Sequence, residues 1–210
     1  MKARGTLILI LAGVSMSWGC SSPFSELQSA RLVEKNHVEA TAYYSAVSVS
    51  VDEENEKTQD DFGFQFAYGV SDKVNMRFRY ERLSAVDLDS KYDVNVWSFG
   101  PKIRLGDDRY SLYLPLGFGT GEMIESQDTW EFHPTLLQTI GMNEYLEFNT
   151  SLKYLWRFDE DRDNAFAFNL GLGLGNDLTK IVFRPEAGIL INPGEDGFFW
   201  HWSIGVSLFR

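Results

Sequence analysis

Three residues near the C-terminus carry the side chains of an activated serine: the Glu186 carboxylate, the His201 imidazole and the Ser203 hydroxyl. In such a cluster the imidazole takes the hydroxyl proton and the carboxylate orients the imidazole. If the strands that flank Asn192–Gly197 pair as a hairpin, Glu186 lies opposite Ser203 and diagonal to His201, on one face. The spacing therefore predicts a candidate catalytic cluster, although no nucleophile-elbow motif surrounds Ser203 and Arg184 lies beside it.

A larger set of charged residues occupies alternate positions of strand-like runs, opposite the large apolar side chains. If this face lines an enclosed lumen, two functions are open: a narrow pore that tolerates small anions, or a packed lumen held by arginine–glutamate pairs. The set has six basic and three acidic members, so the lumen is expected to be locally positive. The members are Arg77, Arg79, Glu81, Lys102, Arg104, Glu147, Lys153, Arg184 and Glu186.

The acidic run Asp52–Asp61 is a third candidate, because its six acids could bind cations or a partner at a cell surface. The run lacks the glycine and the ligand spacing of an EF-hand loop. His133 and His201 are expected on nearly opposite sides of the barrel, so a shared metal site is not expected. The sequence implies no metal and no cofactor.

The elements that must position these residues are typified by Ala165–Gly175. Large residues at every second position, from Phe166 to Leu174, alternate with alanine, asparagine and glycine. A period of two is the mark of a strand with two unlike faces. A large apolar face opposite a nearly bare one suits a lipid-facing exterior and a crowded lumen.

Similar runs follow one another from Val38 to the C-terminus. They are separated alternately by short turns, most of which begin with glycine, and by longer polar loops. The first of the longer loops is Asp52–Asp61, which contains the six acids. This asymmetry is typical of outer-membrane barrels, whose periplasmic turns are short and whose extracellular loops are long. We predict an all-β fold, an antiparallel up-and-down transmembrane barrel with eight or twelve strands as alternatives to ten. The ten expected strands are 38–51, 62–70, 74–83, 93–105, 110–121, 129–140, 145–158, 165–174, 180–191 and 198–209.

Composition supports this class. The 210 residues carry a formal charge of −11, which argues against nucleic acid as a partner because nucleic-acid binding needs a basic surface. Aromatic residues make up 15% of the chain and there are 18 glycines, as expected of many strands and turns. Beyond the leader, no apolar run is long enough for a spanning helix.

The N-terminus predicts a secretory signal peptide over residues 1–19, with Lys2 and Arg4 before a short apolar stretch. Cys20, the single cysteine, follows Gly19 as the acylated cysteine follows the leader of a bacterial lipoprotein. We therefore expect a lipid, a palmitate-type acyl group, on Cys20. Ordinary signal-peptidase cleavage after Gly19 is the alternative.

Residues 20–37 are predicted to be a lipidated periplasmic tether, with a small plug in the barrel mouth as the alternative, and residues 38–210 to be the barrel. Ten strands are an even number, so both termini are expected in the periplasm of a bacterial outer-membrane protein. The tryptophans outside the leader fall in the extracellular half of their strands, as an interfacial aromatic girdle requires. They are Trp97, Trp130, Trp156, Trp200 and Trp202.

The chain resembles the small outer-membrane barrels of Gram-negative bacteria. The resemblance rests on the lipoprotein-like leader, the tight turn within Tyr68–Arg77 and the final alternating strand Trp200–Leu208. It implies outer-membrane lipid, lipopolysaccharide and the barrel-insertion and lipoprotein-processing machineries as partners, with a small anionic solute as a further one.

The expected role is structural, or that of a narrow, porin-like, anion-tolerant channel. The alternatives are an outer-membrane hydrolase, acting on protein or lipid, and a surface binding protein that uses the acidic loops. A soluble lipocalin-like barrel is disfavoured because its lumen is apolar and its outside polar.

Overall fold

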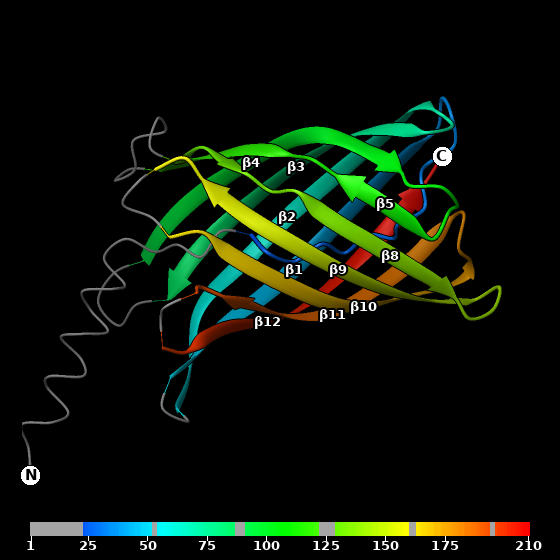
Figure 1. The fold of residues 1–210 in the computed structure, drawn as a ribbon. Coiled ribbons are helices and arrows are strands. Elements are labelled where there is room, and N and C mark those ends of the chain that lie inside the picture. Colours follow the sequence, from blue (N-terminus) through cyan, green and yellow to red (C-terminus); the bar gives the residue numbers. More distant parts are fainter. Residues whose placement is uncertain (1–22, 52–53, 87–90, 122–128, 160–162, 194–195) are drawn as a thin grey trace, which may run out of the picture.

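The computed structural model describes residues 23–51, 54–86, 91–121, 129–159, 163–193 and 196–210, and in them the strands close into one antiparallel barrel (Figure 1). Each strand pairs with its neighbours in the sequence, and the last strand closes on the first. The prediction of a ten-stranded up-and-down barrel is confirmed.

Twelve labelled segments make up these ten strands, because the fifth strand is β5 followed by β6 and the sixth is β7 followed by β8. The first half of the barrel comprises β1 (Val38–Val51), β2 (Glu54–Ser71), β3 (Val74–Val86), β4 (Lys91–Arg104), β5 (Tyr110–Tyr113) and β6 (Leu116–Gly121). The second half comprises β7 (Glu131–Phe132), β8 (Thr135–Gly141), β9 (Leu146–Arg157), β10 (Ala165–Asp177), β11 (Ile181–Ile191) and β12 (Phe198–Phe209).

Prolines divide the fifth and sixth strands. Pro115 lies between β5 and β6, and Pro134 lies between β7 and β8. Proline has no main-chain N–H to donate to the ladder, so regular pairing stops at these positions. The Pro115 carbonyl still accepts from His133 N at 3.0 Å, and the Pro134 carbonyl from Tyr154 N at 3.0 Å, which keeps the wall continuous.

The acidic run is mostly strand, which corrects the expectation of a loop over Asp52–Asp61. β2 begins at Glu54, because the last residues of β1, Ser48–Val51, pair with Glu54–Lys57 beyond a bulge at Thr58 of β2. The prediction was wrong because it treated acidity as a loop signal. A paired hairpin that projects past the apolar belt, as Figure 1 shows for the tips of β1 and β2, can carry charge on both faces.

The two faces of each strand differ as predicted. In β10 the side chains of Phe166, Leu170 and Leu172 are exposed on the outside. Ala167 and Asn169, on the other face, are buried. The same alternation places Ile204, Val206 and Leu208 of β12 and three phenylalanines of β2 outside, so that a continuous apolar belt surrounds a polar interior.

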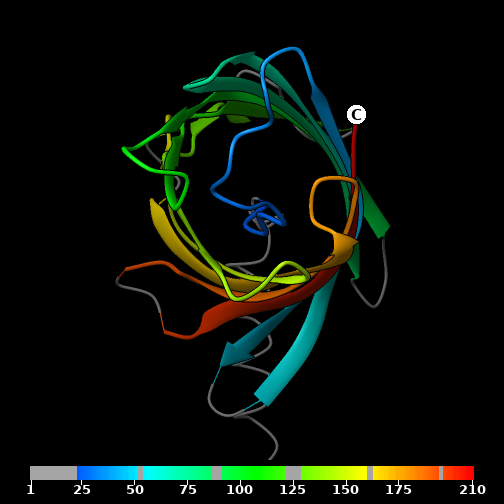
Figure 2. The same ribbon diagram turned by 90° about the vertical axis from the view of Figure 1, so that its right-hand side faces the viewer.

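Residues 23–33 lie inside the barrel, so the described part of the expected 20–37 segment resembles the alternative of a plug more than that of a free tether. Seen along the barrel axis, the chain before β1 runs from the centre of the ring of strands to its rim (Figure 2), where residues 34–37 are exposed. Phe24, Leu27 and Ala30 are each at most 2% exposed. We call residues 23–33 the plug.

Among the described residues, no helix has the length and apolar character needed to cross a membrane.

Candidate functional site

The main chain of the plug is bound by side chains that project inward from the barrel wall. Three wall cations donate to its carbonyl oxygens. Lys153 Nζ donates to Pro23 O at 3.0 Å, and Arg79 Nη1 donates to Ser25 O at 2.6 Å. Lys102 Nζ donates to the carbonyls of two residues, Ser29 at 2.5 Å and Arg31 at 2.9 Å. Main-chain oxygens of the plug therefore supply partial negative charge to three buried wall cations.

The wall carboxylate Glu186 binds the plug in the opposite sense. Its two oxygens accept from the consecutive N–H groups of Glu26 and Leu27, at 2.7 and 2.8 Å. Leu27 has a φ of 51°, in the left-handed region. Consecutive N–H groups on a backbone bent in this way form a concave anion-binding site. The strain at Leu27 is therefore offset by two hydrogen bonds to a buried charge.

Neutral wall side chains bind much of the remaining main chain of the plug. Asn169 donates to Phe24 O at 2.7 Å, and Gln65 donates to Glu26 O at 2.8 Å. Thr139 Oγ1 accepts from Ala30 N at 2.6 Å. The Asn75 amide, oriented to satisfy both groups, accepts from the N–H of Val33 at 2.6 Å and donates to its carbonyl at 3.1 Å. These contacts recognise an extended main chain more than particular side chains.

Apolar contacts fix the plug near both ends of its path. Phe24 packs in a buried cluster at the end of the barrel where the long connections lie, with Val47, Leu155, Ala165, Ala167 and Leu190. Ala30 packs in a second cluster with Tyr113 and Leu137. The Phe24 ring also meets the His201 ring edge to face at 4.6 Å. Burial of a phenylalanine side chain contributes roughly 1.5–3 kcal/mol, so Phe24 is a substantial anchor.

The charged wall residues are arranged in pairs around the plug. Arg77 contacts Glu39 at 2.8 Å, and Arg184 contacts Glu147 at 2.9 Å and Glu39 at 3.8 Å. Arg79 contacts Glu81 at 2.6 Å, and Lys153 contacts the plug's own Glu26 at 2.7 Å. Pairing of this kind offsets the cost of burying each charge. Of the nine predicted lumen residues, Arg104 alone is not buried, and it pairs with Asp108 of a short turn at 3.0 Å.

The candidate catalytic residues meet only in part. His201 Nδ1 is 2.6 Å from Ser203 Oγ, and His201 Nε2 is 2.9 Å from Asn169 Oδ1. Glu186 Oε1 is 3.9 Å from His201 Nε2, and both of its oxygens bind the plug. Asn169 therefore orients the imidazole where Glu186 was expected to do so. Ser203 donates onward to Ser45 Oγ at 2.7 Å.

This cluster is closed to any substrate while the plug is in place. His201 and Ser203 are each 1% exposed, and Phe24 lies against the imidazole. The close approach of Gly188 completes the packing, because a Cβ there would lie 1.9 Å from Asn169 Oδ1. The hydrogen bonds of Asn169 and His201 fix the plug against the wall. Among the described residues, this packing leaves no space for a substrate beside Ser203 and no identifiable oxyanion site.

A cavity of about 10 Å³ lies in the lumen beside the plug, between Pro23, Glu26, Arg79, His133 and Lys153. That is about the space of one water molecule. No group of three or more potential metal-ligating side chains occurs among the described residues.

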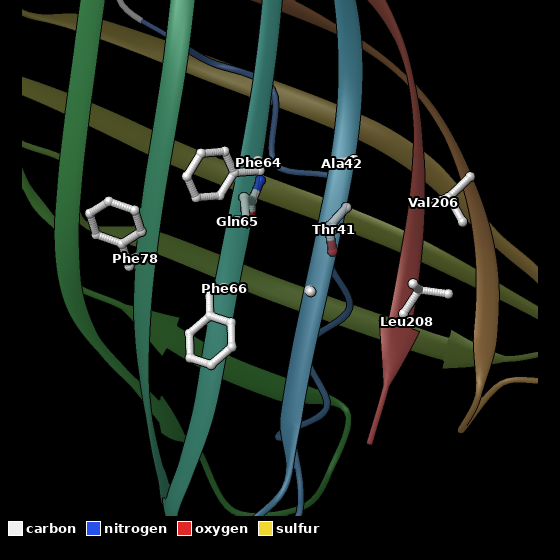
Figure 3. Close-up of a pocket in the computed structure, with 9 residues that line it drawn as sticks. Thr41, Ala42, Phe64, Gln65, Phe66, Phe78, Val206 and Leu208 are labelled. Carbon is white, nitrogen blue, oxygen red and sulfur yellow. The ribbon is translucent and has the colours of Figure 1, made fainter.

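A larger hollow, of about 560 Å³, lies on the outer surface of the barrel (Figure 3). It forms where the small residues Ala40 and Ala42 of β1 lie between phenylalanines of β2 and β3 and Val206 and Leu208 of β12. Its apolar lining side chains are part of the apolar belt. The two polar lining residues, Thr41 and Gln65, are buried, and their side chains form hydrogen bonds inside the barrel.

The acidic hairpin and the tryptophans lie mostly toward the long-connection end. Asp60 accepts from Tyr44 and pairs with Lys57 at 2.7 Å, while Asp61 is buried and accepts from Gln59 at 2.7 Å. Trp130, Trp156, Trp200 and Trp202 lie at or near strand ends there, whereas Trp97 lies at mid-strand in β4.

Several residues of the site were missed by sequence reasoning. Glu39, Gln65, Asn75, Thr139 and Asn169 are polar residues at inward positions of their strands. Their alternation with outward apolar residues was a usable signal, but the predicted lumen set held only charged residues from Arg77 onward, which left out Glu39 and the four neutral residues. The signal peptide over 1–19 and the lipidation at Cys20 lie outside the described residues.

No family model matches the chain, and no curated protein matches it. Among solved structures, the attachment invasion locus protein Ail of Yersinia pestis is 12% identical, over 84% of this chain and 99% of that one, with a TM-score of 0.41. The outer membrane protein OprG of Pseudomonas aeruginosa is 14% identical, over 87% and 99%, with a TM-score of 0.35. The translocator domain of the autotransporter NalP from Neisseria meningitidis is 7% identical, over 97% and 95%, with a TM-score of 0.45. Similarity at this level concerns the fold and not the activity.

Proposed function

We propose that this chain is an outer-membrane β-barrel whose lumen is sealed by its own N-terminal segment, so that its resting role is structural and non-conducting. The observation that carries the proposal is the binding of the plug main chain by wall side chains along the lumen. The cavity between the plug residues Pro23 and Glu26 and the wall has about the volume of one water molecule.

The membrane location rests on the surface of the barrel. A closed barrel has no unpaired strand edges, which is the condition for strands to cross a bilayer. The outward residues form an apolar belt, with Phe66 42% exposed, Leu170 43% and Leu208 52%. In a soluble protein an exposed apolar patch of this extent marks an interaction site or an aggregation hazard. In the proposed location, membrane lipid covers the apolar belt. Lipopolysaccharide contacts the barrel at the end that carries the long connections.

Conductance of the refolded, full-length chain in planar bilayers tests the sealed state. The parent protein is expected to show no discrete steps. Glu186→Gln is expected to show brief openings, because it weakens the site for two consecutive plug N–H groups. Glu39→Gln is the matched control, since it also removes a buried lumen carboxylate but one held by Arg77 and Arg184 of the wall.

The openings are expected to favour anions. Withdrawal of the plug frees Arg79, Lys102 and Lys153 from the carbonyls that they bind. Rings of basic side chains select for anions in pores. A small anionic solute is thus the class that an opened lumen admits. Steady open channels from the folded parent protein would overturn the sealed state, and cation preference in Glu186→Gln would overturn the anion assignment.

We further propose that Cys20 is acylated after removal of residues 1–19, which makes the chain a lipoprotein handled by the lipoprotein-processing and barrel-insertion machineries. The support is the position of the single cysteine directly after the leader. Metabolic labelling with a radioactive fatty acid is expected to mark the parent chain and not Cys20→Ser. Equal labelling of the two chains, or labelling of neither, would contradict acylation at Cys20.

A further inference from the structure

We infer that the plug crosses the barrel from end to end, with Pro23 toward the extracellular mouth and not toward the periplasm. This inference rests on the proposed outer-membrane location, which gives the two ends of the barrel their sides. It sets Pro23, where the described chain begins, at the end of the barrel that carries the acidic hairpin.

The contacts of the plug fix its direction. At its amino end, Phe24 packs against Leu155 and Ala165. Leu155 is two residues from the end of β9, and Ala165 is the first residue of β10. The long connection between β9 and β10 lies there, so Phe24 is within about 7 Å of the strand ends along the barrel wall.

The residues that lead from the plug into β1 lie at the opposite end of the barrel. Asn36 N donates to Gly69 O at 2.8 Å, and Gly69 N donates to His37 O at 3.0 Å. Gly69 is two residues from the end of β2, next to the short turn that leads into β3. Between the two ends, Glu26 contacts Glu186 at mid-strand in β11, and Arg31 contacts Glu147 near the short-turn end of β9. The plug therefore makes one full pass of the lumen.

This pass changes the side assigned to the amino terminus. Ten strands alone return the chain to the side where it began, and Arg210 lies at the short-turn end, where its N–H donates to Val38 O at 2.9 Å. The pass through the lumen precedes the ten strands. Pro23 and Arg210 consequently lie at opposite ends of the barrel, in contrast to the expectation that both termini are periplasmic.

Labelling of intact cells with a membrane-impermeant maleimide tests the inference on the full chain. Ser22→Cys is expected to be labelled without lysis, to the same extent as Glu54→Cys in the β1–β2 hairpin. Asp72→Cys in a short turn is expected to be labelled only after lysis. The parent chain reports any labelling of Cys20 itself, and labelling of a free Cys20 in intact cells supports the same side.

The outcomes separate the inference from the proposed function. If the two control positions behave as expected and Ser22→Cys is labelled only after lysis or only after denaturation, the amino terminus does not emerge at the outer mouth and the inference is overturned. If instead Asp72→Cys is labelled in intact cells, or Glu54→Cys is protected, the orientation of the barrel itself is wrong. In that case the proposed function fails, and the inference fails with it.

Discussion

The Glu186→Gln substitution is predicted to loosen the plug while leaving the barrel folded. In the parent protein both carboxylate oxygens accept from the plug, from Glu26 N at 2.7 Å and Leu27 N at 2.8 Å. Glutamine keeps one acceptor and turns an amide N–H toward the other donor. One hydrogen bond is therefore lost, the remaining one loses its charge, and a buried N–H of the plug is left without an acceptor.

The magnitude follows from these changes. A hydrogen bond to a charged group contributes about 1.5–3 kcal/mol, and an unsatisfied buried donor costs about 1–3 kcal/mol. Glu186→Gln is therefore expected to lower the free energy of plug opening by about 3 kcal/mol. The contribution of the unsatisfied donor counts because this N–H binds water again once the plug leaves the lumen. Since about 1.4 kcal/mol corresponds to a factor of ten, the ratio of plugged to open barrels should fall roughly 100-fold.

Hydrogen exchange followed by mass spectrometry measures this ratio on the peptide that covers the plug. Its buried amides should exchange roughly 100-fold faster in Glu186→Gln than in the parent protein, because exchange reports the free energy of local opening. Peptides from β10 and β11 should be unchanged. Glu39→Gln, which alters the wall pairs with Arg77 and Arg184, should leave plug exchange at the parental rate. Equal plug exchange in Glu186→Gln and the parent protein would refute the assignment of Glu186 as the plug's main anion.

Three further predictions concern the lipid belt, the plug exit and the buried serine. Leu170→Arg on the outer face of β10 should lower the free energy of unfolding in liposomes by about 2–4 kcal/mol, the cost of arginine near the bilayer midplane. Glu54→Arg on the hairpin is the control and should leave this free energy unchanged. Equal free energies of unfolding for the two variants would contradict the assignment of Leu170 to the lipid-facing surface. Gly69→Ala should lower the free energy of unfolding by roughly 1–3 kcal/mol and remove the exchange protection of the Asn36 amide, because its Cβ would lie 2.0 Å from Glu34 O. Gly141→Ala is the control, because a Cβ there meets only the end of the Arg31 side chain, at 3.3 Å. Native protection of the Asn36 amide in Gly69→Ala would rule out the close approach of Gly69 to Glu34. Ser203 should not react with a fluorophosphonate probe in the folded protein, because Phe24 covers His201; stoichiometric labelling, lost in Ser203→Ala, would instead reveal an open catalytic cluster.

The strands were predictable because their physical cause is local. Alternation of large apolar with small or polar residues, as in Ala165–Gly175, follows from the two environments on either side of a barrel wall. The predicted start of β2 was wrong because pairing with β1, and not the side-chain pattern, decides where this strand begins. β2 starts at Glu54 because its pairing with β1 continues past the membrane, where acidity carries no penalty.

The plug was not predictable from periodicity, because its main chain makes the contacts. A segment held by hydrogen bonds to its carbonyl and N–H groups needs no particular order of side chains. Two indirect signals were present. Phe24 and Leu27 are costly to expose in a tether, and the predicted lumen set had more basic than acidic members. Three of those basic residues, Lys102, Arg79 and Lys153, do bind plug carbonyls. The predicted excess itself was wrong, because Arg104 is not buried and the carboxylate of Glu39 is.

The candidate catalytic cluster shows the limit of register arguments. Pairing of β11 with β12 does place Glu186 opposite Ser203, as expected. Register also aligns Asn169 with His201, because both lie opposite Gly188, which has no side chain to separate them. Register could not show that the plug binds both oxygens of Glu186, because that contact depends on what fills the lumen.

The most direct test of the plugged lumen is a nuclear Overhauser measurement on the full-length chain refolded into nanodiscs, with the Phe24 ring and the valine and leucine methyl groups labelled. Cross-peaks from the Phe24 ring to Val47, Leu155 and Leu190 are predicted, since these side chains share one buried cluster. A Phe24 ring with the chemical shifts of an unfolded chain and no cross-peak to any of the three, in a barrel shown to be folded, would contradict the plugged lumen.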